Sequence, residues 1–409
     1  MNNLMEIEEL QEEFFKLSGN ESKKVLKQFN VLKKCVDESL PLSHALNELK
    51  LSYDDLEYVI HHRPEFQRQK YHTLDDFKEK QIDIPVVSFF SGAGGLDLGF
   101  EAVGFSHSLL VEKIPLFCET LKFNRPDWDV YSGDVSKKDE MINEVEKRIG
   151  KQNKFDGVFV GGPPCQSFSI AANQRFARSG ENFKRVGFSH ETNGNLFFDY
   201  IELIKHFQPR AFLIENVPGL MEIDDGEQLD NAYAELEKAG YQINEPLILR
   251  ADHYRVPQQR TRLFVIGSRT TNKFIAPKRT EGSLVCGNVF QIPIQGLKNH
   301  ITREHSAASV LRYMELPYGA RDKLGRVDRL DPSKPSKTII AGGTNGGGRS
   351  HLHPYIPRTL SVRESARLQT FPDNYIFTGP VARQFTQVGN AVPPVLGAQL
   401  GKAIRDSYF

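Results

Sequence analysis

The stretch PVVSFFSGAGGLD, residues 85–97, decides the fold of this 409-residue chain. Its first half is an apolar run typical of a buried strand, and its second half is a glycine-rich turn that leads into a helix. Such a turn lets a cofactor approach the backbone and the helix N-terminus. A dinucleotide fingerprint that starts at Gly92 needs glycine at position 97, where Asp97 stands. The sequence therefore favours a cofactor loop but disfavours a nicotinamide dehydrogenase.

Strands and helices continue to alternate after this stretch, and a polar or reactive residue follows each of four predicted strands. These residues are Glu112, Asp134, Cys165 and Glu215. Ligands of parallel α/β sheets gather at the carboxyl ends of the strands. We therefore expect an α/β, Rossmann-like sheet with a functional site along this edge.

Cys165 stands on a stiff turn, because Pro163 and Pro164 restrict the backbone just before it. A buried structural cysteine is the alternative, since free cysteines are among the most buried residue types. The chain has four cysteines and lacks a CxxC pair or a His/Cys cluster at metal-ligand spacing. We expect no metal site and a reduced, cytoplasmic protein without a membrane span, since no apolar run reaches the required length.

Charge is distributed unevenly along the chain, although the formal net charge is zero. Residues 1–83 contain 12 Lys/Arg and 17 Asp/Glu, a balance of −5, whereas residues 270–360 contain 14 Lys/Arg and 6 Asp/Glu, a balance of +8. The late basic segment suits contacts with phosphates. A solvated surface with a chance imbalance explains the charge equally well.

The first 83 residues are expected to form a separate helical extension that ends in a polar linker. Ser52 and Asp55 resemble a capping box, which predicts a third helix through Ile60. Three short helices are compatible with a helix-turn-helix. However, Asp54 and its acidic neighbours would repel phosphates, which favours a plain bundle packed on the catalytic domain.

Six ordered motifs resemble those of the DNA cytosine-5 methyltransferase family of bacterial restriction-modification systems. They are FFSGAGGLDLGF (89–100), GGPPCQSFS (161–169), ENVPGL (215–220), QQRTR (258–262), RLQTFPDNY (367–375) and QVGNAVPP (387–394). The resemblance covers roughly residues 85–408. It implies a catalytic domain at 84–270 plus 385–409 that uses S-adenosyl-L-methionine, and an irregular, β-rich target-recognition domain at 271–384. A segment at 1–83 remains as the N-terminal extension.

The resemblance also implies a mechanism on a cytosine rotated out of the duplex. Cys165 would add to carbon 6, which makes carbon 5 nucleophilic towards the methyl group. Glu215 would share a proton with N3, and Arg262 would hold the O2 edge of the base. Arg260 would support the loop or a phosphate.

Two further sets of residues follow from the same resemblance. The cofactor-binding set is Phe90, Gly92, Gly94, Gly95, Leu96, Glu112, Asp134, Val135, Pro163, Asn390 and Val392. The expected DNA contacts are Gln166, Arg175, Arg178, Asn345, Arg349 and Ser350. One departure from the family pattern is Ser88, which replaces an acid two residues before the aromatic Phe90.

The partners implied are double-stranded DNA and, functionally, a cognate restriction endonuclease, with the enzyme itself a monomer. A tRNA cytosine-5 methyltransferase and a DNA-binding regulator that acts through the N-terminal helices are the alternatives. The long basic segment favours DNA as the substrate.

Overall fold

The computed structural model describes residues 20–59, 64–164, 195–341 and 351–409. Its centre is an eight-stranded sheet in the order β3-β2-β1-β4-β5-β9-β6, with β7 also paired to β9. The parallel strands are β1 (Pro85–Phe89), β2 (Ser106–Glu112), β3 (Val130–Ser132), β4 (Val158–Gly161) and β5 (Ala211–Asn216). Strand β9 (Thr261–Ser268) pairs antiparallel with β5, and β6 (Gln242–Ile243) and β7 (Leu247–Arg250) each pair antiparallel with β9. The predicted α/β fold is confirmed.

Helices cover both faces of this sheet because its strands alternate between two apolar clusters. Val86 and its neighbours on one face pack against α4 (Gly95–Ala102) and α13 (Pro394–Tyr408). Val87 and its neighbours on the other face pack against α6 (Lys138–Ile149), α8 (Asn195–Phe207) and α9 (Glu227–Lys238). A further helix, α5 (Pro115–Asn124), packs beside β2 and β3. Strands buried on both faces read as continuous apolar runs, as the sequence showed.

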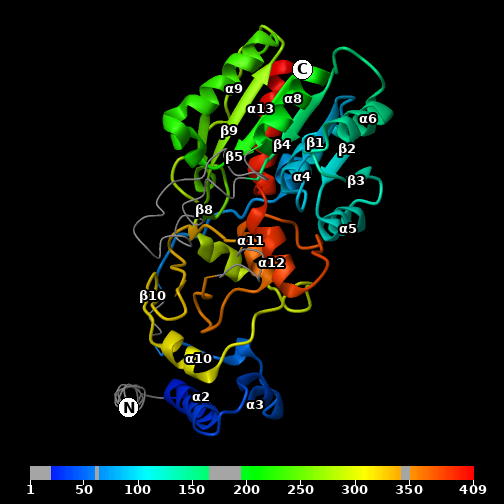
Figure 1. Ribbon diagram of the computed structural model, residues 1–409. Coiled ribbons are helices and arrows are strands. Elements are labelled where there is room, and N and C mark those ends of the chain that lie inside the picture. The colour runs from blue at the N-terminus through cyan, green and yellow to red at the C-terminus, as the bar shows by residue number, and fades with distance from the viewer. Residues whose placement is uncertain (1–19, 60–63, 165–194, 342–350) are drawn as a thin grey trace.

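A second lobe lies below the carboxyl edge of the sheet (Figure 1). It contains α10 (Ala307–Met314), α11 (Val362–Leu368), α12 (Val381–Asn390) and the short strands β10 (Arg321–Asp322), β11 (Val327–Asp328) and β12 (Ser336–Lys337). The parallel pairing of β12 with β8 (Gln258–Gln259) forms a separate two-stranded sheet, which joins this lobe to the segment that leads into β9. The division at 271–384 remains a prediction, and α12 runs across its second boundary.

The N-terminal segment, residues 20–59, forms α2 (Asn20–Asp37) and α3 (Leu42–Glu48), followed by one 3₁₀ turn, Tyr53–Asp55. The Ser52–Asp55 capping box is confirmed, but the longer helix expected after it is wrong. The chain leaves helical geometry at Leu56, where the backbone is extended and the side chain is buried. The second part of a helix-turn-helix is therefore missing from residues 52–59.

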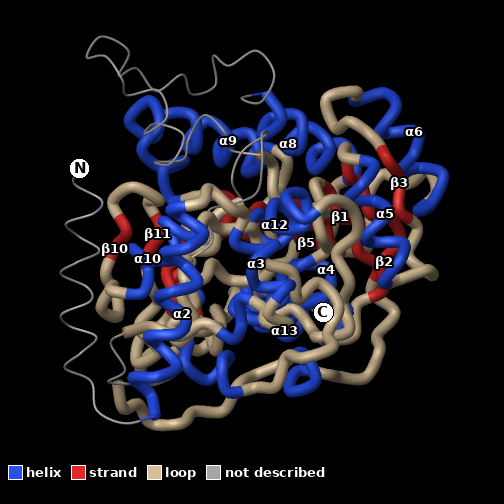
Figure 2. The backbone as a smooth tube through the Cα atoms, turned by 90° about the horizontal axis from the view of Figure 1, so that it is seen from below, coloured by secondary structure: helices blue, strands red, loops and turns tan. Residues whose placement is uncertain are grey.

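The packing partner of the N-terminal helices also differs from the expectation. Val25, Phe29 and Leu32 of α2 share an apolar cluster with Val310 and Met314 of α10. Figure 2 shows α2 and α10 side by side, as Figure 1 does. The bundle therefore completes the second lobe rather than covering the catalytic sheet. Among the described helices, none has the length and apolar character needed to cross a membrane.

Candidate active site

The glycine-rich stretch forms a tight turn between β1 and α4. Phe90, Gly92 and Gly94 all have positive φ angles, of 56°, 56° and 72°. The Gly94 amide donates to the Ser91 carbonyl over 2.8 Å and Gly94 precedes the first residue of α4. A Cβ built on Gly92 would meet no heavy atom closer than the Phe90 carbonyl oxygen, at 4.0 Å. The loop therefore offers an open backbone surface at Gly92, as a cofactor site requires.

Gly95 is needed for a different reason, since the last part of the chain returns to this loop. A Cβ at Gly95 would lie 2.2 Å from the Val392 carbonyl oxygen and 3.1 Å from the Ala391 side chain. The Tyr375 hydroxyl donates to the Ala93 carbonyl over 2.8 Å and braces the same turn. The predicted cofactor loop and the predicted returning segment are thus in direct contact.

We expect Gly95→Ala to displace the returning segment and to weaken cofactor binding about tenfold or more, since overpacking costs about 1–3 kcal/mol. Isothermal titration of the variant with S-adenosylmethionine checks this expectation. Gly240→Ala is the control, because a Cβ there meets nothing within 4 Å, although its φ of 92° makes alanine unfavourable. Equal cofactor affinity in the two variants would contradict the steric argument.

Glu112 at the end of β2 holds the glycine turn. Its two carboxylate oxygens accept from the amides of Gly92 and Ile114, each over 2.8 Å. Burial raises the pKa of this carboxyl group. Each carboxylate oxygen has a second lone pair, so Glu112 retains capacity to accept from a ligand hydroxyl.

Asp134 follows β3 and lies near the same edge. Lys113 Nζ is 2.7 Å from Asp134 Oδ2, and the Ser136 amide and hydroxyl donate to Oδ1. Burial would raise the pKa of Asp134, but hydrogen bonds from Lys113 and Ser136 lower it. Val135 beside it is buried in the sheet core. Both predicted strand-end acids therefore stand at the carboxyl edge as expected.

Glu215 and Arg262 form an ion pair on the adjacent strands β5 and β9. Arg262 Nε is 2.8 Å from Glu215 Oε1, and both side chains are mostly buried, with 17% and 14% exposed. The antiparallel register pairs Glu215 with Phe264, two residues beyond Arg262, so both side chains lie on the same face of the sheet. The ion pair thereby fixes Glu215 and Arg262 relative to each other, and it leaves the second carboxylate oxygen of Glu215, Oε2, outside the pair.

The chain that leaves β4 passes directly beside this acid. A Cβ added at Gly162 would lie 2.9 Å from Glu215 Oε2, and Pro163 is buried. Cys165 lies outside the described residues, as do Gln166, Arg175, Arg178, Asn345, Arg349 and Ser350. Cys165 is three residues after Gly162, a span of about 11 Å at most. Its expected approach to Glu215 is compatible with this chain length and remains a prediction.

Arg260 differs from Arg262 in its surroundings. Its side chain is buried and donates to the backbone carbonyls of Asn390, over 3.1 Å, and Ile339, over 3.4 Å. Burial, together with the nearby Arg262, lowers its pKa well below the usual value. In this arrangement Arg260 supports the returning segment by binding its backbone, while the Asn390 residue itself is exposed.

Gln258 is a supporting residue that the sequence reasoning overlooked, although it lies in the quoted QQRTR motif. It is fully buried, and its Oε1 accepts from the Ile339 amide over 2.9 Å. Its Nε2 donates to Gln369 Oε1 over 3.1 Å, and Gln369 in turn donates to the Val388 carbonyl. The side chain thus links β8 to Ile339, just after β12, and to the C-terminal end of α11. A glutamine next to a predicted buried strand was the available signal.

Ser88 occupies the position at which the family pattern has an acid. Its hydroxyl lies 3.0 Å from that of Ser91, inside the glycine turn.

Among the described residues, no three His, Cys, Asp or Glu side chains are placed to hold a metal ion.

The sequence profile of the C-5 cytosine-specific DNA methylases matches residues 84–406. The chain belongs to this family. It is 33% identical to the Type II methyltransferase M.PspPI of Psychrobacter sp. over 78% of each chain. It is equally similar, at 33%, to the Type II methyltransferase M.Eco47II of Escherichia coli over 81% of each chain.

Solved structures agree with this family membership. A protein described as a DNA modification methyltransferase encoded within an E. coli prophage superimposes with a TM-score of 0.63 and 25% identity, over 80% of this chain and 99% of its own. The Entamoeba histolytica methyltransferase EhMeth shares the fold, with a TM-score of 0.55 and 17% identity over 80% and 99% of the two chains. The chain is thus a DNA cytosine-5 methyltransferase.

A methylase of this family uses S-adenosylmethionine. The residues present fit that group, because the loop is open at Gly92, Glu112 can accept from ribose hydroxyls, and Asp134 lies at the next strand end. Phe90 is partly buried, and its ring meets Tyr200 edge-on at 6.1 Å. This aromatic is the expected stacking surface for the adenine.

Proposed function

We propose that this methylase is the modification enzyme of a Type II restriction-modification system, acting in the cytoplasm as a monomer beside a cognate endonuclease. The names of its two relatives at 33% identity support this role. The observation that carries the chemistry is the Glu215–Arg262 ion pair beside Gly162. We assign Cys165, Glu215 and Arg262 to the reacting base and Arg260 to positioning.

In the proposed reaction the Cys165 thiolate adds to carbon 6 of a cytosine that has left the base stack. A free thiol has a pKa of about 8.5, so a catalytic thiol must be activated locally. Glu215 then shares a proton with N3, which neutralises the negative charge that arrives on the ring. Arg262 orients Glu215 and contacts the O2 edge. When bound, S-adenosylmethionine supplies the electrophilic methyl group for carbon 5. Loss of the carbon-5 proton then breaks the bond between carbon 6 and sulfur and releases Cys165 as the thiolate.

Extrusion of the base allows this chemistry, because a stacked ring cannot accept a thiol and a methyl donor on its faces. It costs on the order of a few kcal/mol, which contacts with the protein offset.

From the sequence alone, we assign DNA contacts to Gln166, Arg175, Arg178, Asn345, Arg349 and Ser350. The proposed DNA-recognition region is the basic segment 270–360, which the β8–β12 pairing joins to the segment that leads into β9.

Transfer of a tritium-labelled methyl group by the purified full-length protein tests the proposal. We expect duplex DNA to be labelled, and bisulfite sequencing to place every modified cytosine in one short sequence context. DNA modified in this way should resist an endonuclease that recognises that context. Efficient labelling of tRNA without labelling of DNA would reverse the substrate assignment, and labelled cytosines without a common context would exclude the Type II role.

A further inference from the structure

The N-terminal segment, residues 20–59, makes several polar contacts with the second lobe, in addition to its apolar packing on α10. Residues 20–59 precede the part of the chain that matches the methylase family, which begins at residue 84. Two of these contacts reach residues 351–359; they come from the short stretch after α3 and use Asp54 and Tyr58.

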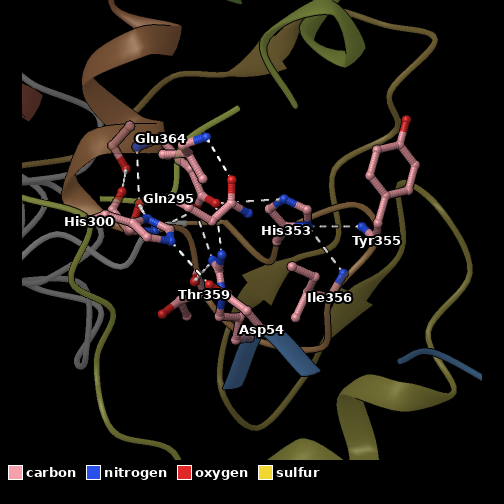
Figure 3. A network of polar contacts seen from close by, with 12 residues as sticks. Asp54, Gln295, His300, His353, Tyr355, Ile356, Thr359 and Glu364 are labelled. Carbon is pink, nitrogen blue, oxygen red and sulfur yellow. Dashed lines mark hydrogen bonds and ion pairs between the residues drawn. The ribbon is translucent and has the colours of Figure 1, made fainter. Parts of the chain in front are cut away.

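Asp54 reaches a buried ion-pair network at the start of α11 (Figure 3). Its Oδ1 accepts from Arg358 Nε over 2.6 Å, and its Oδ2 lies 3.1 Å from His300 Nε2. Arg358 also binds both oxygens of Glu364, each over 2.8 Å. Glu364 caps α11 by accepting from the Ser361 amide over 2.7 Å. Asp54 therefore helps to fix the guanidinium that orients the helix cap.

This network is held in its charged form. Burial would raise the pKa of Glu364, but Arg358 lowers it to about 2. Burial would likewise raise the pKa of Asp54, but hydrogen bonds from His300 and Arg358 bring it well below its usual value. A guanidinium that is almost completely buried needs such partners, because an unpaired charge there is strongly unfavourable.

Tyr58 contacts the same loop at its other end. Its hydroxyl donates to the His353 carbonyl over 2.8 Å. Its ring lies 3.5 Å from the guanidinium carbon of Arg329, and Tyr318 lies 3.8 Å from that carbon. Arg329 donates twice to the Pro354 carbonyl, over 3.0 and 2.8 Å. Arg329 is 1% exposed, so its charge supports the loop and is not presented to a phosphate.

Both contacts hold the loop formed by residues 351–359, which belongs to the basic segment. Tyr58 supports it at His353 and Pro354, and Asp54 supports it at Arg358. Leu352 within the loop also bridges to Arg329 and Thr359. The loop is thus shaped by a segment that lies outside the catalytic sheet and makes no contact with the glycine turn among the described hydrogen bonds and ion pairs.

We propose that the N-terminal segment is a built-in part of the DNA-recognition lobe, and that Asp54 and Tyr58 are positioning residues that set the affinity for DNA. The inference rests on the proposed DNA-modifying function. The inference also predicts the direction of the change in DNA affinity. Removal of an acidic side chain near bound DNA strengthens binding when charge alone acts. Removal of Asp54 is instead expected to weaken it, because the loop loses its support.

The test compares full-length Asp54→Ala, Asp54→Asn and Tyr58→Phe proteins in steady-state methylation of a duplex that contains the target found by bisulfite sequencing. We expect Asp54→Ala to raise the KM for DNA about tenfold. The KM for S-adenosylmethionine and kcat should stay within about twofold of wild type, because the contacts avoid the catalytic edge. Asp54→Asn keeps an oxygen acceptor for Arg358 and should restore part of the affinity.

Asp37→Ala is the matched control, because it removes an equal charge from an exposed position of α2. It should leave the KM for DNA unchanged or lower it. The slope of log KM against log salt should match wild type in the Asp54 variants, since no phosphate contact is removed. Tyr58→Phe keeps the ring over Arg329, so it provides a milder variant if Asp54→Ala unfolds, and it should raise the KM for DNA about threefold.

An unchanged or lower KM for DNA in folded Asp54→Ala overturns the proposal, and so does an unchanged KM in Tyr58→Phe if Asp54→Ala unfolds. A fall in kcat together with a rise in the KM values for both DNA and S-adenosylmethionine would also overturn the proposal, because it would show a general structural role. These results are distinct from failure of the proposed function, in which the wild-type protein itself does not methylate duplex DNA.

Discussion

The Cys165→Ala protein is expected to bind S-adenosylmethionine normally and to lose at least about 10⁴-fold of its methylation rate on duplex DNA. The reason is chemical, because carbon 5 of cytosine is a poor nucleophile until a thiolate adds to carbon 6. No neighbouring side chain among the described residues at this edge offers a second thiol, since Cys118 and Cys286 are both buried. Single-turnover assays with labelled methyl donor measure the loss.

A substrate analogue provides a second readout for the same variant. In 5-fluorocytosine at the target position, carbon 5 carries fluorine in place of the proton whose loss releases the thiolate. The sulfur of Cys165 therefore remains bonded to the ring. We expect a covalent complex with the wild-type protein and none with Cys165→Ala. Cys286→Ala is the control, because burial raises the pKa of that thiol and keeps it protonated. Retention of the covalent complex by Cys165→Ala would show that another group is the nucleophile.

Glu215→Gln is expected to lower kcat/KM for DNA by about 10²–10⁴-fold, the range for loss of a positioned acid–base group. Glutamine can still accept a hydrogen bond from Arg262 over the 2.8 Å distance of the ion pair, so the local geometry is kept. It cannot exchange a proton with N3 of the base. The fall should therefore be in kcat, with the cofactor affinity unchanged.

The matched control for this variant is Glu237→Gln, which makes the same substitution at an exposed position of α9. It should methylate DNA at the wild-type rate. A loss of less than about fivefold in Glu215→Gln would contradict the proton-sharing role, because general acid–base groups contribute more than this.

Local sequence signals predicted the catalytic sheet and the strand-end acids well. Apolar runs marked the parallel strands, and the Ser52–Asp55 capping box formed as the sequence indicated. These signals act over a few residues, so they can be read without the tertiary structure. The close approach of Glu215 to Arg262 could be inferred only from the family resemblance, because it depends on the antiparallel register of β5 and β9.

Tertiary contacts decided the features that the sequence did not reveal. The third N-terminal helix is absent because residues 56–59 turn towards the second lobe, where the Val59 amide donates to the Met314 carbonyl. The Glu57 amide donates to Gln28 Oε1 instead of continuing a helical ladder. Helix α10 was missed because its apolar face is short and finds its partner in α2, far away in the sequence. A local sequence pattern cannot identify packing partners that lie far away in the sequence.

The contact between Gly95 and Val392 has a consequence for how the protein is made. Gly95, in the proposed methyl-donor loop, leaves the ribosome early, whereas Val392, which it contacts, emerges only just before the final helix α13. Domains generally begin to fold from the N-terminus during synthesis. The nascent chain can thus assemble most of its parallel strands while this contact is still missing. We therefore expect a chain released before Val392 to leave the proposed methyl-donor site incomplete.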